Sequence, residues 1–151
     1  MTKKTRIQPQ KTVMAKTGES KLAWFLFDAK GKTLGRMASE ITKILRGKHK
    51  PSFTANIDCG DGVIIVNAEE IAVTGNKEAT KIYRNYSGHV GGMKETQLSV
   101  MRARKPEMIL ETAIKKMMPR TRLAKGQLKR LRIFKGQEHS MDAQQPIKVN
   151  T

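Results

Sequence analysis

The chain has 151 residues, 30 of them Lys or Arg and 13 Asp or Glu, so its formal net charge is +17. This length suits one domain with an appended arm and leaves no room for two enzyme-sized units. The longest apolar run, residues 22–27, is shorter than the roughly twenty residues of a membrane-spanning helix, and a single cysteine excludes an intrachain disulfide. We therefore expect a cytoplasmic protein, without a secretory signal, that binds an acidic partner.

The first predicted elements follow a basic N-terminal arm. Residues 1–21 have little apolar periodicity, and we interpret them as a flexible arm in front of a single domain at residues 22–151. The apolar run 22–27 is typical of a strand that is buried on both faces. Apolar residues at 34–45 recur at helical spacing, which predicts a helix ending at Gly47.

The later elements are predicted from the same patterns. They are a central strand at 63–66, shorter extended segments at 71–74 and 81–86, a helical stretch that starts at Leu98, restarts at Pro106 and ends at Pro119, a short helix over 123–131 and a strand over 131–134. The order strand, helix, strand in the first half favours parallel pairing through a crossover. We therefore expect an α/β fold.

Positive charge is concentrated rather than spread evenly. Nine basic and no acidic residues lie at 112–137, and smaller basic clusters lie at 1–21 and 30–50, whereas 58–70 contains four carboxylates and no Lys or Arg. A membrane-surface segment would favour an amphipathic helix with several large apolar anchors, but the stretch 112–137 contains Pro, Gly and only one aromatic residue. Nucleic acid is therefore the better partner.

Catalytic and cofactor chemistry finds weak support. Gly31-Lys32-Thr33 resembles the end of a phosphate-binding loop, but the motif needs a glycine where this chain has Leu26. A helix start here could still hold a single phosphate, including one of an RNA backbone. Cys59 lies between carboxylates, which disfavours a nucleophile, and no histidine has metal-ligand spacing. We expect no cofactor and no metal, and a nucleotide-using enzyme is the competing hypothesis.

The segment 83–92 combines two tyrosines, an arginine and a histidine with three glycines. This composition suits base stacking and phosphate contact, because glycine permits close approach of the backbone. The same composition also suits a surface loop whose tyrosines pack on the core. The residues alone leave both interpretations open.

Short motifs in collinear order resemble ribosomal protein thirteen of the large subunit, in its bacterial form. The motifs are Thr33-Leu34-Gly35-Arg36 and residues 45–51, 58–61, 66–68, 73–77, 87–92, 104–107, 113–119 and 136–146. The resemblance covers roughly 24–147 and implies a three-layer α/β/α domain with a small, mostly parallel sheet. It also implies binding to large-subunit ribosomal RNA, a role in early assembly and no catalytic activity.

The resemblance implies RNA contacts at the matching positions, namely Arg46, Lys48, His49, Lys50, Lys77, His89, Arg104, Lys115 and Lys116. To these we add one loop tyrosine and five cations of the acid-free stretch: Tyr86, Arg120, Arg122, Lys125, Lys129 and Arg130. The chain departs from the family at 120–125, where a glycine-containing loop is usual, and at Lys116, where glycine is common.

The expected partners are large-subunit ribosomal RNA and neighbouring large-subunit proteins, with no membrane and no small-molecule substrate. An RNA-binding regulator that acts away from the ribosome has the same composition and remains an alternative.

Overall fold

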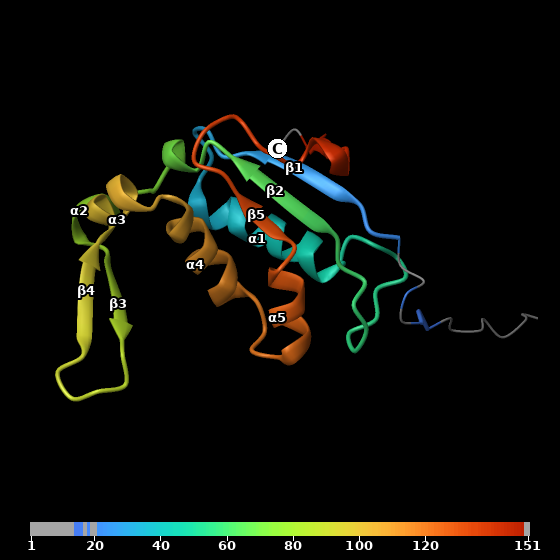
Figure 1. Ribbon diagram of the computed structural model, residues 1–151, viewed down its shortest axis with the longest axis horizontal. Coiled ribbons are helices and arrows are strands. Elements are labelled where there is room, and N and C mark those ends of the chain that lie inside the picture. Colours follow the sequence, from blue (N-terminus) through green and yellow to red (C-terminus); the bar gives the residue numbers. More distant parts are fainter. Residues whose placement is uncertain (1–13, 17, 19–20, 150–151) are drawn as a thin grey trace, which may run out of the picture.

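The computed structural model describes residues 14–16, 18 and 21–149 (Figure 1). Most of the predicted arm, residues 1–21, therefore lies outside the described residues. The remainder shows a four-stranded sheet with helices packed against it, and a separate two-stranded hairpin.

Four parallel strands form the main sheet, in the order β5-β2-β1-β6. They are β1 (Trp24–Asp28), β2 (Gly62–Val66), β5 (Leu131–Ile133) and β6 (Ile147–Val149). All five residues of β2 are buried, as a fully apolar, β-branched run in a central position requires. The prediction of an α/β fold with a small, mostly parallel sheet is confirmed.

Three helices lie on one side of this sheet (Figure 1). They are α1 (Leu34–Arg46), α4 (Glu107–Met117) and α5 (Arg122–Leu128). Apolar residues on one face of α1, including Ile41, pack with Phe27 and Ile65 of the sheet and with Ile114 of α4. Each such large side chain stabilises the fold by about 1.5–3 kcal/mol when it is fully buried. This shared core fixes α4 and α5 beside α1.

The opposite face of the sheet is covered differently. Ile64 alternates with Val63 and Ile65, so it points away from the helices, yet it is fully buried. Because β5 and β6 occupy opposite edges, their connection at 134–146 leads from one edge of the sheet to the other, and it contains the short 3-10 helix η2 (Asp142–Gln144).

A hairpin projects from the body of the protein (Figure 1). It consists of β3 (Ile82–Tyr86) and β4 (Met93–Gln97), with the short helices α2 (Lys77–Thr80) and α3 (Leu98–Arg104) at its base. Arg102 anchors this base, because its Nε and Nη2 each donate to the carboxylate of Glu78 at 2.9 Å. Its Nη1 donates to two carbonyl oxygens, 2.6 Å from Glu69 and 3.0 Å from Ile71, next to the 3-10 helix η1 (Ala68–Glu70).

The structure contains elements that the sequence did not predict. The segment 71–74, predicted as extended, belongs to no strand but forms an isolated parallel bridge from Ala72 to Thr33. The strands β4 and β6 and the helix α2 were not predicted. The sequence of β4, Met-Lys-Glu-Thr-Gln, has no apolar pattern, and its extended conformation depends on pairing with β3. Helix α2 and strand β6 are too short to show a periodicity.

Candidate nucleic-acid interface

The turn after α1 places the first predicted cations. Gly47 ends the helix in the left-handed conformation at φ 78°, and its N–H and that of Lys48 donate to carbonyls of the last turn. A Cβ on Gly47 would lie 2.5 Å from the carbonyl oxygen of Cys59. Only glycine therefore lets this turn approach the 58–61 loop, which carries two carboxylates.

Asp61 is fully buried at this junction and holds two of the predicted RNA-binding residues. Lys50 Nζ lies 2.6 Å from its Oδ1, which also accepts the Ala23 N–H at 3.0 Å. His49 Nε2 lies 2.8 Å from Oδ2, as an ion pair when the imidazole is protonated. A buried carboxylate loses its hydration, and nearby cations compensate for that loss. His49 and Lys50 therefore support the fold here.

Asp58 forms an ion pair with Arg130, another of the predicted RNA-binding residues. The guanidinium donates from Nη1 to Oδ2 at 2.7 Å and from Nη2 to Oδ1, and Gln127 also donates to Oδ1 at 3.3 Å. Burial raises the pKa of Asp58, but hydrogen bonds from Arg130, its charge, the Gly60 amide and Gln127 outweigh burial and lower that pKa below its ordinary value. Arg130 therefore joins the loop before β2 to the start of β5.

The other predicted cations lack a carboxylate partner among the described residues. We call them the unpaired cations: Arg46, Lys48, Lys77, Arg104, Lys115, Lys116, Arg120, Arg122, Lys125 and Lys129. All are exposed except Arg46, which is half-buried. Exposed ammonium and guanidinium groups without an internal partner can bind an external anion without first breaking an ion pair.

Two of the unpaired cations meet at one cavity of about 270 Å³. Lys77 and Lys116 line it together with Lys81, which the sequence prediction missed. We call this cavity the lysine pocket; its wall also contains residues 33–35 and 72–74. Three lysines from α2, its following residue and α4 thus surround one depression. A phosphate there would be attracted by three positive charges.

The first turn of α1 forms the far wall of the lysine pocket. This turn contains no acidic residue, and Thr33 makes no side-chain cap. The helix dipole therefore adds to the attraction for an anion. The preceding loop is not a polyphosphate cradle, because the Gly31 N–H donates to the carbonyl of Glu70 and the Lys32 N–H to that of Ala29.

The two tyrosines of the 83–92 segment differ in environment. Tyr83 is half-buried, burial raises its pKa, and Lys81 Nζ lies 5.5 Å from its ring centroid. Tyr86 is 63% exposed at the end of β3, and His89 is exposed in the loop beyond it. Tyr83 therefore packs against the protein, whereas Tyr86 has a free surface on which a base could stack.

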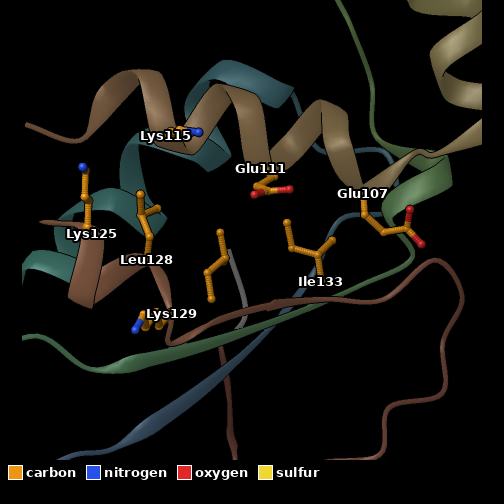
Figure 2. A pocket seen from close by; sticks show the side chains of 8 residues that line it. Glu107, Glu111, Lys115, Lys125, Leu128, Lys129 and Ile133 are labelled. Carbon is orange, nitrogen blue, oxygen red and sulfur yellow. The ribbon is translucent and has the colours of Figure 1, made fainter. Parts of the chain in front are cut away.

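Within the described residues, the predicted residues lie at separate places on the surface. Arg46 and Lys48 flank the end of α1, Arg120 and Arg122 flank the start of α5, and Arg104 lines a separate depression beside the hairpin. The remaining three, Lys115, Lys125 and Lys129, line a groove between α4, α5 and β5 (Figure 2). The interface is thus several cationic patches around the core rather than one site.

Comparison with known proteins identifies the family. The family model described as ribosomal protein L13 matches residues 22–140, which is most of the chain. The chain belongs to the ribosomal protein L13 family. This membership agrees with the prediction that the protein is not an enzyme.

Curated relatives named large ribosomal subunit protein uL13 match nearly end to end. The one from Chlamydia pneumoniae is 53% identical over 138 residues, 91% of this chain and 93% of its own length. That of Thermoanaerobacter sp. (strain X514) is 49% identical over 140 residues, 93% of this chain and 98% of its own length. That of Methylococcus capsulatus is 48% identical over 136 residues, 90% of this chain and 96% of its own length.

The sequence prediction missed Lys81 and Arg102. Only Lys81 lies in a local sequence pattern from which its position could have been predicted. Lys81 follows Lys77 by four residues, the spacing that brings side chains together on a helix, but α2 has only four residues and was not predicted. Arg102 stabilises the base of the hairpin through Glu78, which is 24 positions away, and no local pattern links the two.

In the part of the chain that the structure describes, no three His, Cys, Asp or Glu side chains gather as metal ligands. None of the helices within the same described ranges combines the length and apolarity needed to cross a membrane.

Proposed function

We propose that this protein is a structural constituent of the large ribosomal subunit in the cytoplasm, that it binds large-subunit ribosomal RNA and that it supports early subunit assembly. Membership of the ribosomal protein L13 family supports the first part, since the curated relatives carry the name large ribosomal subunit protein. The observation that carries RNA binding is the set of exposed cations without carboxylate partners. We further propose that residues 22–151 form one RNA-binding domain.

The chemistry of this interface favours recognition of the RNA backbone. Lysines neutralise phosphates as point charges, whereas Arg120 and Arg122 can each donate two parallel hydrogen bonds to one phosphate. The whole chain has only seven aromatic residues, so base stacking contributes at few positions, with Tyr86 as the exposed one. RNA shape and phosphate spacing therefore dominate the selection of the binding site.

The lysine pocket supports this proposal because it brings three lysines to one depression. Lys77, Lys81 and Lys116 line it, and the dipole at the start of α1 adds to the attraction for an anion. One phosphate of the RNA backbone placed there would be attracted by the charges of all three lysines. We expect this pocket to set the register of the protein on its RNA.

Salt dependence of RNA binding tests the proposal. If the full chain contacts six to ten phosphates, its affinity for a large-subunit RNA fragment falls about 10³- to 10⁵-fold between roughly 50 and 200 mM salt. Filter binding or fluorescence anisotropy measures this slope. A nearly flat response would contradict recognition by unpaired cations.

A matched pair of variants assigns the effect to the lysine pocket. The triple change Lys77→Ala, Lys81→Ala and Lys116→Ala should reduce the salt slope by about two to three. The control is Lys30→Ala with Lys135→Ala, because these lysines already pair with Glu70 and Glu69 at 3.2 and 2.8 Å. Equal slopes in both variants would show that the pocket does not bind RNA.

Sedimentation tests the ribosomal assignment separately. In a sucrose gradient of cell lysate, the tagged full chain should sediment with large subunits and 70S particles. Its presence only in the light fractions would favour an RNA-binding regulator that acts away from the ribosome. This result is independent of which residues contact RNA.

A further inference from the structure

A groove of about 570 Å³ lies between α4, α5 and β5 (Figure 2). Its apolar floor is formed by Leu128, Leu131 and Ile133, and its rim is charged. We call it the edge groove, because β5 is the edge strand of the main sheet. The RNA-binding proposal gives no role to its apolar floor.

The outer edge of β5 has unpaired backbone groups. The Val63 N–H donates to the carbonyl of Arg130, and the Phe134 N–H donates to that of Ile65, so residues 130, 132 and 134 face β2. Alternation along a strand then turns the N–H and C=O groups of Leu131 and Ile133 to the open edge. An open edge of this kind is a template for another strand.

Charge around the edge groove separates into two ends. Lys115, Lys125 and Lys129 lie at one end, and Glu107 and Glu111 lie toward the other (Figure 2). Neither glutamate forms an ion pair among the described residues. The helix dipole favours a carboxylate in the first turn of α4, but Glu111 lies beyond that turn and gains no such stabilisation.

This charge pattern distinguishes a polypeptide from RNA. An RNA backbone is negative throughout and would meet repulsion from the two glutamates, and it has no apolar surface to match the floor. A polypeptide can carry a carboxylate toward the lysines, a cation toward the glutamates and apolar side chains between them. Electrostatic complementarity of this kind selects the partner and its register.

We propose that the edge groove binds an extended segment of a neighbouring protein, which adds a strand to the outer edge of β5. Main-chain hydrogen bonds to Leu131 and Ile133 provide the pairing, and the apolar floor receives alternate side chains of the segment. An acidic side chain faces Lys125 and Lys129, and a basic one faces Glu111. This proposal assigns Lys125 and Lys129 to a protein partner instead of RNA, and the RNA contacts proposed for the other unpaired cations do not depend on it.

Photocrosslinking in assembled large subunits tests the occupant. The full chain carries p-benzoylphenylalanine at Lys129 or at Glu111, two exposed positions on opposite ends of the groove, or at exposed Glu40 of α1 as a control. We expect both groove positions, but not the control, to crosslink to one segment of a single ribosomal protein. RNA adducts from both groove positions, or no adduct from either, would overturn the proposal.

The mapped segment is then synthesised and its binding to the full chain is measured. The change Lys125→Glu with Lys129→Glu should weaken binding at least tenfold, and a peptide with its acidic residue changed to lysine should restore it. Amide hydrogen exchange at Leu131 and Ile133 should slow when the peptide binds. Unchanged affinity in the variant would overturn the charge pairing, and unchanged exchange would overturn the strand addition.

Discussion

Lys50, which follows the turn after α1, and Arg130, which precedes β5, differ from the cations around the lysine pocket because each lies beside a carboxylate. Lys50 is 2.6 Å from the buried carboxylate of Asp61, and Arg130 donates twice to Asp58. Lys77 and Lys116 are exposed, with no carboxylate partner among the described residues. Tertiary proximity to a carboxylate, and not net charge, therefore separates cations that hold the fold from cations available to RNA.

The difference follows from the cost of burying charge. Removing one partner of a buried ion pair leaves the other uncompensated, whereas an exposed lysine keeps its hydration and loses little on mutation. Variants of the two groups should therefore change different quantities. Paired positions should change the free energy of unfolding, and unpaired positions should change RNA affinity.

The largest loss of stability is expected at Asp61. Asp61→Ala leaves Lys50 and His49 without their buried partner and should lower the free energy of unfolding by about 3 kcal/mol. Urea denaturation followed by circular dichroism measures the change. Glu40→Ala, at an exposed position, is the control and should stay within about 0.5 kcal/mol. A similar small change in both variants would mean that the Asp61 pairs do not support the fold.

A smaller loss is expected at Arg130. Arg130→Ala removes two charge-assisted hydrogen bonds to Asp58 and should cost about 2 kcal/mol in the same urea experiment. Lys129→Ala, at the exposed neighbouring position, provides the control and should be close to neutral. If Arg130→Ala unfolds at the wild-type urea concentration, the Asp58 pair is not structural.

The pH dependence of stability sharpens the same point. Because the pKa of Asp58 is lowered in the folded state, its contribution is present above the unfolded value of about 3.9 and is lost as the pH falls through the folded pKa. Arg130→Ala should make this acid-induced loss smaller than in the wild type. Urea midpoints measured at a series of acidic pH values test this, and parallel curves for the two proteins would contradict it.

The smallest effect on stability is expected in the loop between α4 and α5. Arg120→Glu with Arg122→Glu should change the free energy of unfolding by less than about 0.5 kcal/mol, because both side chains are exposed and unpaired. Incorporation into large subunits should nevertheless fall, since two charges are reversed and the net charge changes by four units. Loss of folded protein in circular dichroism would show that these arginines are structural instead.

The extent of sequence-based prediction can be traced to particular elements. The apolar runs of β1 and β2 and the apolar face of α1 predicted those elements, because a strand inside a sheet leaves a continuous apolar run and a helix buried on one face leaves a periodic pattern. In β1 only Phe27 is buried, so the expected burial on both faces holds for β2 but not for β1. Strand β4 leaves no such pattern, since its residues are mostly exposed and polar and its pairing is set by β3. Short local patterns cannot report a stabilising partner elsewhere in the chain.

The sequence predicted which basic residues belong to the candidate site, but it did not predict which of them pair with carboxylates of the fold. The family resemblance indicated Lys50, Lys77 and Lys116 as RNA-binding residues, and clustered charge added Arg130. The chain separation between Asp58 and Arg130 is 72 residues, so only the folded structure shows that one neutralises the other. Distance to a carboxylate is a property of the fold.

Lysine reactivity tests the separation of the two groups most directly. Each lysine of the full chain is acetylated by a dilute reagent, alone and bound to large-subunit ribosomal RNA, and mass spectrometry gives its modification rate. We predict that Lys77, Lys81 and Lys116 react readily in the free protein and become protected by RNA, whereas Lys50 reacts slowly in both states. Protection of Lys50 by RNA, with unchanged rates at the three pocket lysines, would contradict the account.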